Sequence, residues 1–214
     1  MHIVCPDEKI KHLVDTDQMN ANSVIVDIGA SAGEFIQSIF GLPHFNTFKI
    51  FAIEPSKHNV KRLSEKKFSN VKIFQMALVG EKRDKVTLTD FVGINGRFHQ
   101  WPNIYGNHVN DIQRNSHRNE FIRTENYEVD CICFFDFLKL IKTNRIDYLK
   151  MDAEGAEKEF FESMCGIKLS KYVKQISVEC HHGEQQQLSW LIMLRRGLGF
   201  KYVSSWSNEI YACI

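Results

Sequence analysis

The sequence contains no run of 18 apolar residues, and its first residues lack the basic stretch and apolar core of a secretory signal. We therefore expect neither a membrane-spanning nor an exported protein, and predict a cytoplasmic location. An excess of one charge is also missing, because the 214 residues carry a formal net charge of +1 with both signs mixed along the chain. Without a broad basic region, a nucleic-acid substrate is not expected.

Linker segments and paired cysteines are missing as well. No stretch rich in proline, glycine or serine divides the chain, so we expect one domain over residues 1–214. The six cysteines are scattered and none forms a CxxC pair, which is typical of reduced thiols in a cytoplasmic protein.

Residues 92–125 show little periodicity but are rich in aromatic residues, histidine and arginine. Long segments of this kind inside a compact domain are typically lids or binding loops. We predict that this insertion is a substrate lid, and an inert surface insertion is the alternative.

Strand and helix patterns alternate along the rest of the chain. Apolar segments predict core strands at residues 23–29, 49–54, 71–78, 146–152 and 173–180. Helical patterns follow at residues 33–41, 56–66, 134–141, 156–164 and 184–198. Further strands are expected at 85–91 and 127–133, a terminal hairpin at 200–204 and 209–213, and a short leading helix capped by Asp7. This order predicts a doubly wound α/β fold, with a mostly parallel sheet, helices on both faces and one antiparallel edge.

The first core strand runs into a glycine turn that contains Gly29 and Gly33, and Glu54 follows 21 residues after Gly33. A carboxylate at the end of the next strand can accept both ribose hydroxyls of a nucleoside. The turn reads G-x-x-x-G, and Asp27 and Glu34 would place two carboxylates where a dinucleotide's pyrophosphate needs free N–H groups. The ammonium and sulfonium of S-adenosylmethionine suit such an acidic turn. We therefore predict a site for this methyl donor; helix capping by the two carboxylates is the alternative.

The segment from Lys150 to Glu157, K-M-D-A-E-G-A-E, resembles the K-x-D-x-E-G-A-E signature of the FkbM family of S-adenosylmethionine-dependent methyltransferases. Further matching segments, in the family's order, are Asp27–Gly33, Glu54-Pro55-Ser56, Ala77-Leu78, Phe135–Leu138 and Ile176–His181. The resemblance covers about residues 20–214. It implies the seven-stranded, Rossmann-like class I methyltransferase fold and methylation of a hydroxyl on a small molecule such as a sugar or polyketide-like metabolite.

Two groups of site residues follow. We assign to the donor S-adenosylmethionine and its product S-adenosylhomocysteine the residues Asp27, Gly29, Ala30, Ser31, Gly33, Glu54, Pro55, Ser56, Ala77 and Asp152. Carboxyl ends of parallel strands face the ligand crevice, which gives as candidate catalytic residues Asp152, Glu154, Glu179 and His181. His181 or His182 is the first candidate for the general base, because an imidazole titrates near neutral pH; surface histidines are the alternative.

Several alternatives remain open at this level. Asp152, Glu154, Glu179 and His181 form an oxygen-rich set that could hold Mg²⁺, although we do not expect a metal. The motif [DN]-P-P-[YF] is missing after residues 146–152, which disfavours transfer to the amino groups of bases. The competing functions are an N-methyltransferase and a non-catalytic, donor-binding interaction module, with a homodimer as an expected assembly.

Overall fold

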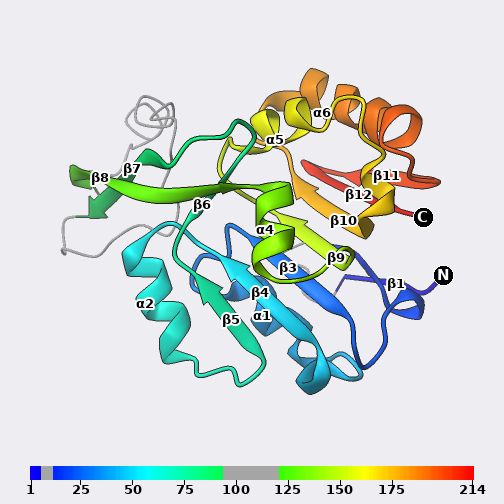
Figure 1. Cartoon of the computed structure of the whole chain (residues 1–214), viewed down its shortest axis with the longest axis horizontal. Coiled ribbons are helices and arrows are strands. Elements are labelled where there is room, and N and C mark those ends of the chain that lie inside the picture. Colours follow the sequence, from blue (N-terminus) through cyan, green and yellow to red (C-terminus); the bar gives the residue numbers. More distant parts are fainter. Residues whose placement is uncertain (6–11, 94–120) are drawn as a thin grey trace.

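The computed structural model describes residues 1–5, 12–93 and 121–214 (Figure 1). Its centre is a seven-stranded sheet in the order β11-β12-β10-β9-β3-β4-β5. Strands β10, β9, β3, β4 and β5 are parallel, whereas β12 runs antiparallel to both of its neighbours. The strands are β3 Val24–Ile28, β4 Lys49–Ile53, β5 Val71–Phe74, β9 Ile146–Met151, β10 Val173–Glu179, β11 Tyr202–Trp206 and β12 Glu209–Cys213. The predicted α/β fold class, with its antiparallel terminal hairpin, is confirmed.

Helices cover both faces of this sheet. Helices α1 (Glu34–Ser38) and α2 (Lys57–Glu65) bury apolar side chains in one core cluster. The opposite cluster contains side chains of α4 (Phe134–Leu140), α5 (Glu157–Ser163) and α6 (Gly183–Ile192). Short 3-10 turns lie at Thr16–Gln18, Ile39–Gly41, Phe45–Thr47 and Leu169–Lys171. The two clusters enclose the sheet, so its strands are apolar on both faces.

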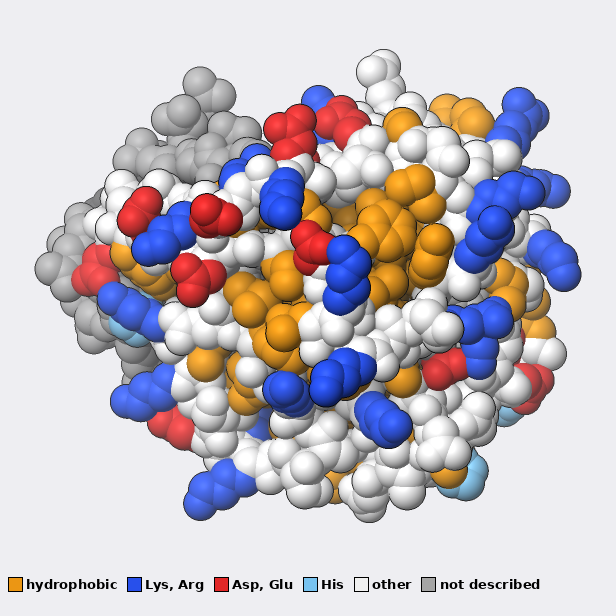
Figure 2. All heavy atoms as spheres, in the orientation of Figure 1, with side chains coloured by type: hydrophobic (Ala, Val, Ile, Leu, Met, Phe, Trp, Pro, Cys, Tyr) orange, Lys and Arg blue, Asp and Glu red, His pale blue; other side chains and the backbone are white. Residues whose placement is uncertain are grey.

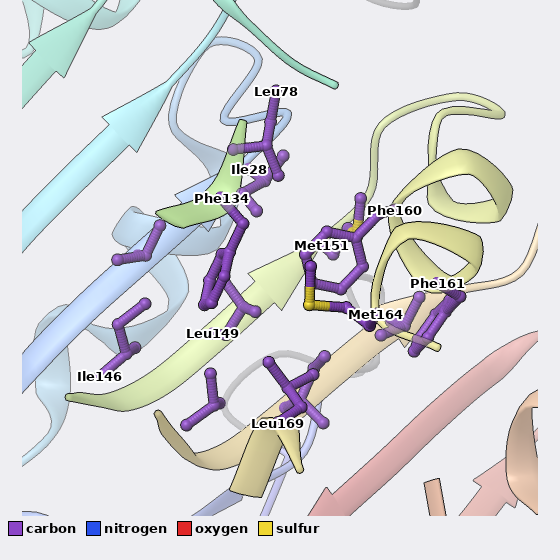
Figure 3. Close-up of a cluster of buried hydrophobic side chains, with 14 of the residues drawn as sticks. Ile28, Leu78, Phe134, Ile146, Leu149, Met151, Phe160, Phe161, Met164 and Leu169 are labelled. Atoms are coloured by element: carbon purple, nitrogen blue, oxygen red, sulfur yellow. The ribbon is translucent and has the colours of Figure 1, made fainter. Parts of the chain in front are cut away.

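Figure 3 shows the packing in the second cluster, where Phe160 and Met164 lie against Met151 of β9. Full burial of side chains of this size contributes roughly 1.5–3 kcal/mol each. Figure 2 shows apolar side chains also gathered at the surface around α4, where Leu140 is 45% exposed. The apolar character of this face therefore continues from the core to the surface.

One predicted strand is divided between two sheets. The expectation of a single strand over residues 71–78 is wrong, because β5 ends at Phe74 and β6 (Ala77–Val79) pairs with β8 (Phe121–Cys133). Strand β7 (Lys85–Gly93) completes a separate three-stranded sheet, and Figure 1 shows β8 as a long strand leading to α4. The N–H of Met76 donates to the carbonyl of Phe74 at 3.0 Å, so the chain turns between the two strands. Apolar alternation continues through this turn, and the pattern alone does not reveal the change of partner.

Two other expectations need adjustment. The helix expected over residues 184–198 is α-helical only to Ile192, and Met193–Gly197 form a π-helical turn. The insertion 92–125 begins in β7 and ends in β8, while residues 94–120 and the cap predicted at Asp7 lie outside the described residues. Among the described helices, none is long and apolar enough to cross a membrane.

The leading segment is fixed to the sheet by polar contacts. Strands β1 (Ile3–Val4) and β2 (Val14–Asp15) pair antiparallel. The N–H of Asp15 donates to Oε1 of Gln175 at 2.8 Å, and the Gln175 amide donates back to the Asp15 carbonyl at 3.1 Å. The hydroxyl of Tyr148 donates to the carbonyl of Leu13 at 2.9 Å. These contacts are buried, so they hold residues 12–15 against β9 and β10.

The turn after β3 approaches β9 so closely that only glycine fits. Gly29 has a φ of +71°, and its N–H donates to the carbonyl of Ile53 at 2.9 Å. A Cβ at this position would lie 1.7 Å from the carbonyl oxygen of Asp152. Both the positive φ and the missing side chain are therefore required here.

A buried ion pair joins the same elements. Lys150 of β9 places Nζ 3.1 Å from Oδ1 of Asp27 on β3 and donates to the carbonyl of Gly29 at 2.7 Å. Burial alone would lower the pKa of Lys150, but the carboxylates of Asp27 and Asp152 outweigh it and raise this pKa above its ordinary value. Lys150 is therefore charged at neutral pH and connects β3, the glycine turn and β9.

The first prediction concerns the close approach at Gly29. Gly29→Ala should lower the free energy of unfolding by about 2–5 kcal/mol, because it adds left-handed backbone strain to a steric clash. Gly41→Ala is the matched control, since a Cβ there meets no atom within 4 Å, and it should change stability by less than about 0.5 kcal/mol. Urea denaturation measures both. Equal stabilities of the two variants would contradict the role given to Gly29.

The second prediction concerns the ion pair. Lys150→Met leaves the Asp27 charge buried without its partner, which should cost about 3–5 kcal/mol at pH 8. Because the pKa of Asp27 then rises, the loss should shrink as the pH falls toward 5, where the native state binds a proton. The double variant Asp27→Asn/Lys150→Met removes both charges and should recover part of the stability. A loss of the same size at both pH values would show that packing, rather than charge, dominates.

Candidate active site

A cavity of about 240 Å³ opens at the carboxyl ends of β3, β4, β9 and β10. Of the predicted site residues, those that line it are Gly29, Ala30, Ser31, Glu54, Pro55, Ala77, Asp152, Glu154 and Glu179. Further lining residues are His12, Ile28, Glu34, Phe35, Ile53, Leu78, Leu88, Lys150, Ala153 and Ala156. One cavity therefore brings together the glycine turn, the acid after β4 and the acidic ends of β9 and β10.

Glu54 is held at one end of the cavity by backbone donors. The Ser31 N–H donates to its Oε2 at 2.8 Å, and the Ser56 N–H donates to its Oε1 at 2.9 Å. The side chain is 2% exposed, and this burial raises the pKa of Glu54 to about 7. The Asn59 side chain also hydrogen-bonds to Glu54. A carboxylate has about four acceptor positions, so an acceptor position remains for a ribose hydroxyl.

Beside Glu54 the cavity wall is apolar. Ile53, Ala77, Leu78 and Leu88 line this part, and they come from β4, β6 and β7. Leu88 is fully buried. An apolar wall next to a hydroxyl-binding carboxylate is the combination that a nucleoside requires.

Three predicted donor residues lie outside the cavity lining. Asp27 is fully buried beneath the turn and faces Lys150, so it reaches the cavity only through that cation. Gly33 is the N-cap of α1 with a φ of +86°, and Ser56 caps α2, where its Oγ accepts the Asn59 N–H. These residues shape the site rather than face the ligand. The direct contact with the donor that we predicted for Asp27 is not supported by its position.

The opposite end of the cavity is acidic, and its carboxylates contact His181, which is itself absent from the cavity lining. Nδ1 of His181 lies 3.1 Å from Oε1 of Glu157, while its Nε2 lies 3.4 Å from Glu154 and 3.8 Å from both Asp152 and Glu179. Burial alone would lower the pKa of His181, but the hydrogen bond and charge of Glu157, with Glu154 and Asp152, raise it to about 10.

His181 is therefore an imidazolium at neutral pH and has no lone pair with which to accept a proton. Our expectation of His181 as the first candidate base does not fit this arrangement. His182, the other candidate, is N-cap of α6 with Nε2 3.0 Å from the carbonyl of Gly155, and it is absent from the cavity lining.

Four carboxylates surround the single positive charge of His181, so this end of the cavity is negatively charged. Burial raises the pKa of Glu154 to about 7 and also raises that of Glu179, whose Oε1 accepts a hydrogen bond from the Asn208 amide. Asp152 keeps one buried oxygen without a hydrogen bond among the described residues. This end of the cavity favours cationic or hydroxyl-rich groups and disfavours anions.

A metal ion is the alternative occupant of this end. Asp152, Glu157 and His181 each bring one potential ligand atom within 4.8 Å of the others. In the present arrangement the protonated imidazole of His181 supplies the positive charge between the carboxylates. The expectation that no metal takes part stays a prediction.

Sequence reasoning missed two polar residues of the cavity wall. Lys150 occupies an alternating strand position, and only its pairing with Asp27 shows that its side chain is buried beneath the turn. His12 comes from the leading segment and contacts Ser177 and Glu209, more than 160 residues away. Lys150 begins the K-M-D-A-E-G-A-E segment, but that motif gives no sign of its partner Asp27, and no local motif marks His12.

Comparisons with known proteins bear on the family and the fold of the chain. The family described as the methyltransferase FkbM domain matches residues 27–202. Among solved structures, the methyltransferase FkbM from Methylobacillus flagellatus KT is 16% identical, with a TM-score of 0.54, over 91% of this chain and 44% of that chain. The METTL16 MTase domain is 12% identical, with a TM-score of 0.49, over 92% of this chain and 61% of that chain. No curated protein matches the sequence.

The chain thus spans less than half of the Methylobacillus protein and about three fifths of the METTL16 domain. The family match itself covers most of this chain and contains the glycine turn, Glu54 and the acidic ends of β9 and β10. The chain therefore belongs to the family of the methyltransferase FkbM domain.

Proposed function

We propose that the protein transfers a methyl group from S-adenosylmethionine to a hydroxyl group of a small molecule, such as a sugar or a polyketide-like metabolite. The observation that carries this proposal is the single cavity that joins Glu54 and the glycine turn to the carboxylates of Asp152, Glu154 and Glu179. One end suits a nucleoside, and the other suits the positive charges of the donor and a hydroxylated acceptor.

Each part of the cavity has a role in donor binding. Glu54 accepts a ribose hydroxyl, and the apolar wall with Ala77 and Leu88 contacts the base. Asp152, whose buried Oδ1 accepts no hydrogen bond from the described residues, accepts the donor's ammonium group, while the backbone of Gly29 and Ser31 borders the ligand closely. When bound, S-adenosylmethionine supplies a methyl carbon made electrophilic by the neighbouring sulfonium.

The acidic end positions the acceptor. Glu154 and Glu179 accept hydrogen bonds from acceptor hydroxyls and hold the attacking oxygen in line with the methyl carbon and the sulfur. Such positioning contributes about 7–11 kcal/mol to lowering a barrier. The same carboxylates would repel a phosphorylated acceptor. An amine acceptor, the N-methyltransferase alternative, would also be attracted, and the bond formed in the product distinguishes the two.

We also propose that residues 92–125 form a lid over the acceptor, since both ends of this segment leave strands β7 and β8, and Leu88 of β7 lines the cavity. Closure of such a segment excludes water from the reacting groups. A homodimer and a cytoplasmic location complete the proposal.

The third prediction concerns Glu54. Because its pKa is about 7 in the free protein and ribose hydroxyls favour the ionised carboxylate, binding should release a proton. The affinity for S-adenosylhomocysteine should then rise about tenfold from pH 6 to pH 8. Glu54→Gln should weaken binding at pH 8 by about 1.5–3 kcal/mol and remove the pH dependence. Calorimetric titration at both pH values measures these effects. If the variant keeps the pH dependence, the titrating group is Glu154 instead.

The fourth prediction tests the reaction itself. Incubation with methyl-labelled S-adenosylmethionine and a panel of hexoses, deoxyhexoses and phenols should yield a labelled O-methyl product, identified by mass spectrometry. Excess EDTA should leave the rate unchanged, because the imidazolium of His181 supplies the charge between the carboxylates. A rate abolished by EDTA and restored by Mg²⁺ would assign Asp152, Glu157 and His181 to a metal. Binding of the donor with no transfer to any compound would favour the non-catalytic module.

A further inference from the structure

His12 brings a buried imidazole to the cavity from outside the segment that defines the family. The family match covers residues 27–202, so neither His12 nor its partner Glu209 belongs to it. The side chain of His12 is 2% exposed and lines the cavity together with Lys150 and Asp152. A polar ring at this depth requires either a structural or a chemical explanation.

The contacts of His12 define which ring nitrogen carries the proton. Nδ1 lies 2.9 Å from Oγ of Ser177 and 3.1 Å from Oε2 of Glu209. The Ser177 hydroxyl donates to the same carboxylate oxygen at 3.3 Å. Because an ionised carboxylate only accepts hydrogen bonds, the contact with Glu209 requires the proton on Nδ1. The other ring nitrogen, Nε2, makes no hydrogen bond or ion pair within the part of the chain that the structure describes.

The fold holds this ring firmly. Phe35 packs edge-on against His12, with 5.6 Å between ring centroids, and itself stacks on Tyr148 at 5.5 Å. The hydroxyl of Tyr148 binds the carbonyl of the next residue, Leu13. The backbone and the ring of this segment are thus both fixed by buried groups, which a catalytic imidazole requires for precise placement.

We propose that His12 is the general base of the methyl transfer, oriented by Glu209; this inference rests on the proposed function. The acceptor's O–H proton moves to Nε2 of His12 while the oxygen forms its bond to the methyl carbon. The carbon–sulfur bond breaks, its electron pair stays on sulfur, and S-adenosylhomocysteine leaves. The positive charge lost from sulfur reappears on the imidazolium, where Glu209 stabilises it. Glu209 acts through His12 and is a positioning residue.

The charged groups around His12 support this assignment. Glu209 from β12 faces Nδ1, Asp27 from β3 lies within electrostatic range, and Lys150 from β9 stands between Asp27 and Asp152. Glu34 of α1 borders the same cavity. His181, in contrast, is held protonated by four carboxylates. Among the described residues, Nε2 of His181 lies within 4 Å of three carboxylates, whereas Nε2 of His12 has no carboxylate at that distance.

His12→Asn is the informative variant, because the asparagine amide reproduces the donor at Nδ1 and lacks Nε2. With the first panel compound that the wild-type protein methylates, kcat should fall about 10²–10⁴-fold. The dissociation constant of S-adenosylhomocysteine should stay within about threefold, so the loss falls on kcat and not on donor binding. Glu209→Gln should lower kcat less than His12→Asn does and leave KM within about threefold, because it disturbs the orientation of the ring without removing Nε2.

The outcomes separate this inference from the function on which it rests. Transfer by the wild-type protein with unchanged kcat in His12→Asn would overturn the base and leave the methyltransferase. Loss of S-adenosylhomocysteine binding in His12→Asn would assign His12 to the donor and also overturn it. A wild-type protein that transfers no methyl group would remove the function itself. Nitrogen-15 NMR of the wild-type ring is an independent test, since a proton on Nε2 of the neutral ring contradicts the proposal even if the variants do not fold.

Discussion

The buried ion pair between Lys150 and Asp27 is the constraint on which the site depends. It connects the centre of the sheet at the point where β3 and β9 end, and Lys150 also binds the carbonyl of Gly29. The glycine turn can therefore lie against Asp152 without a side chain between them. Because two desolvated charges are stable only as a pair, the turn has one geometry, and the two ends of the cavity keep a fixed separation.

Much of the fold follows from the sequence because its signals are local. Alternating strand and helix patterns predict the order of elements, and the segment from Gly29 to Glu54 predicts which residues gather at one end of the cavity. The alternating pattern does not show which strand a segment pairs with, or which group a polar side chain faces. Residues 71–78 alternate continuously although β5 and β6 belong to different sheets, and Asp27 reads as a ligand-facing acid although it faces Lys150.

The polar chemistry of the site is less predictable, because it depends on contacts between distant segments. His181 reads as a neutral base from its residue type, but four carboxylates from the loop after β9, α5 and β10 make it a cation. His12 reads as an isolated residue, and only the arrangement of β10 and β12 brings Ser177 and Glu209 to it. Spacing along the chain carries no information about either environment.

The hairpin formed by β11 and β12 contributes a residue to each of two polar contacts in the site. Asn208, in the turn between β11 and β12, binds Glu179 at the acidic end, and the next residue, Glu209, binds His12. Successive strand residues point to opposite faces of a sheet, so inserting one residue in this turn would move the Glu209 carboxylate to the other face. The two-residue turn between β11 and β12 lines no part of the cavity. Its length nevertheless decides whether Glu209 can contact His12 while Asn208 contacts Glu179.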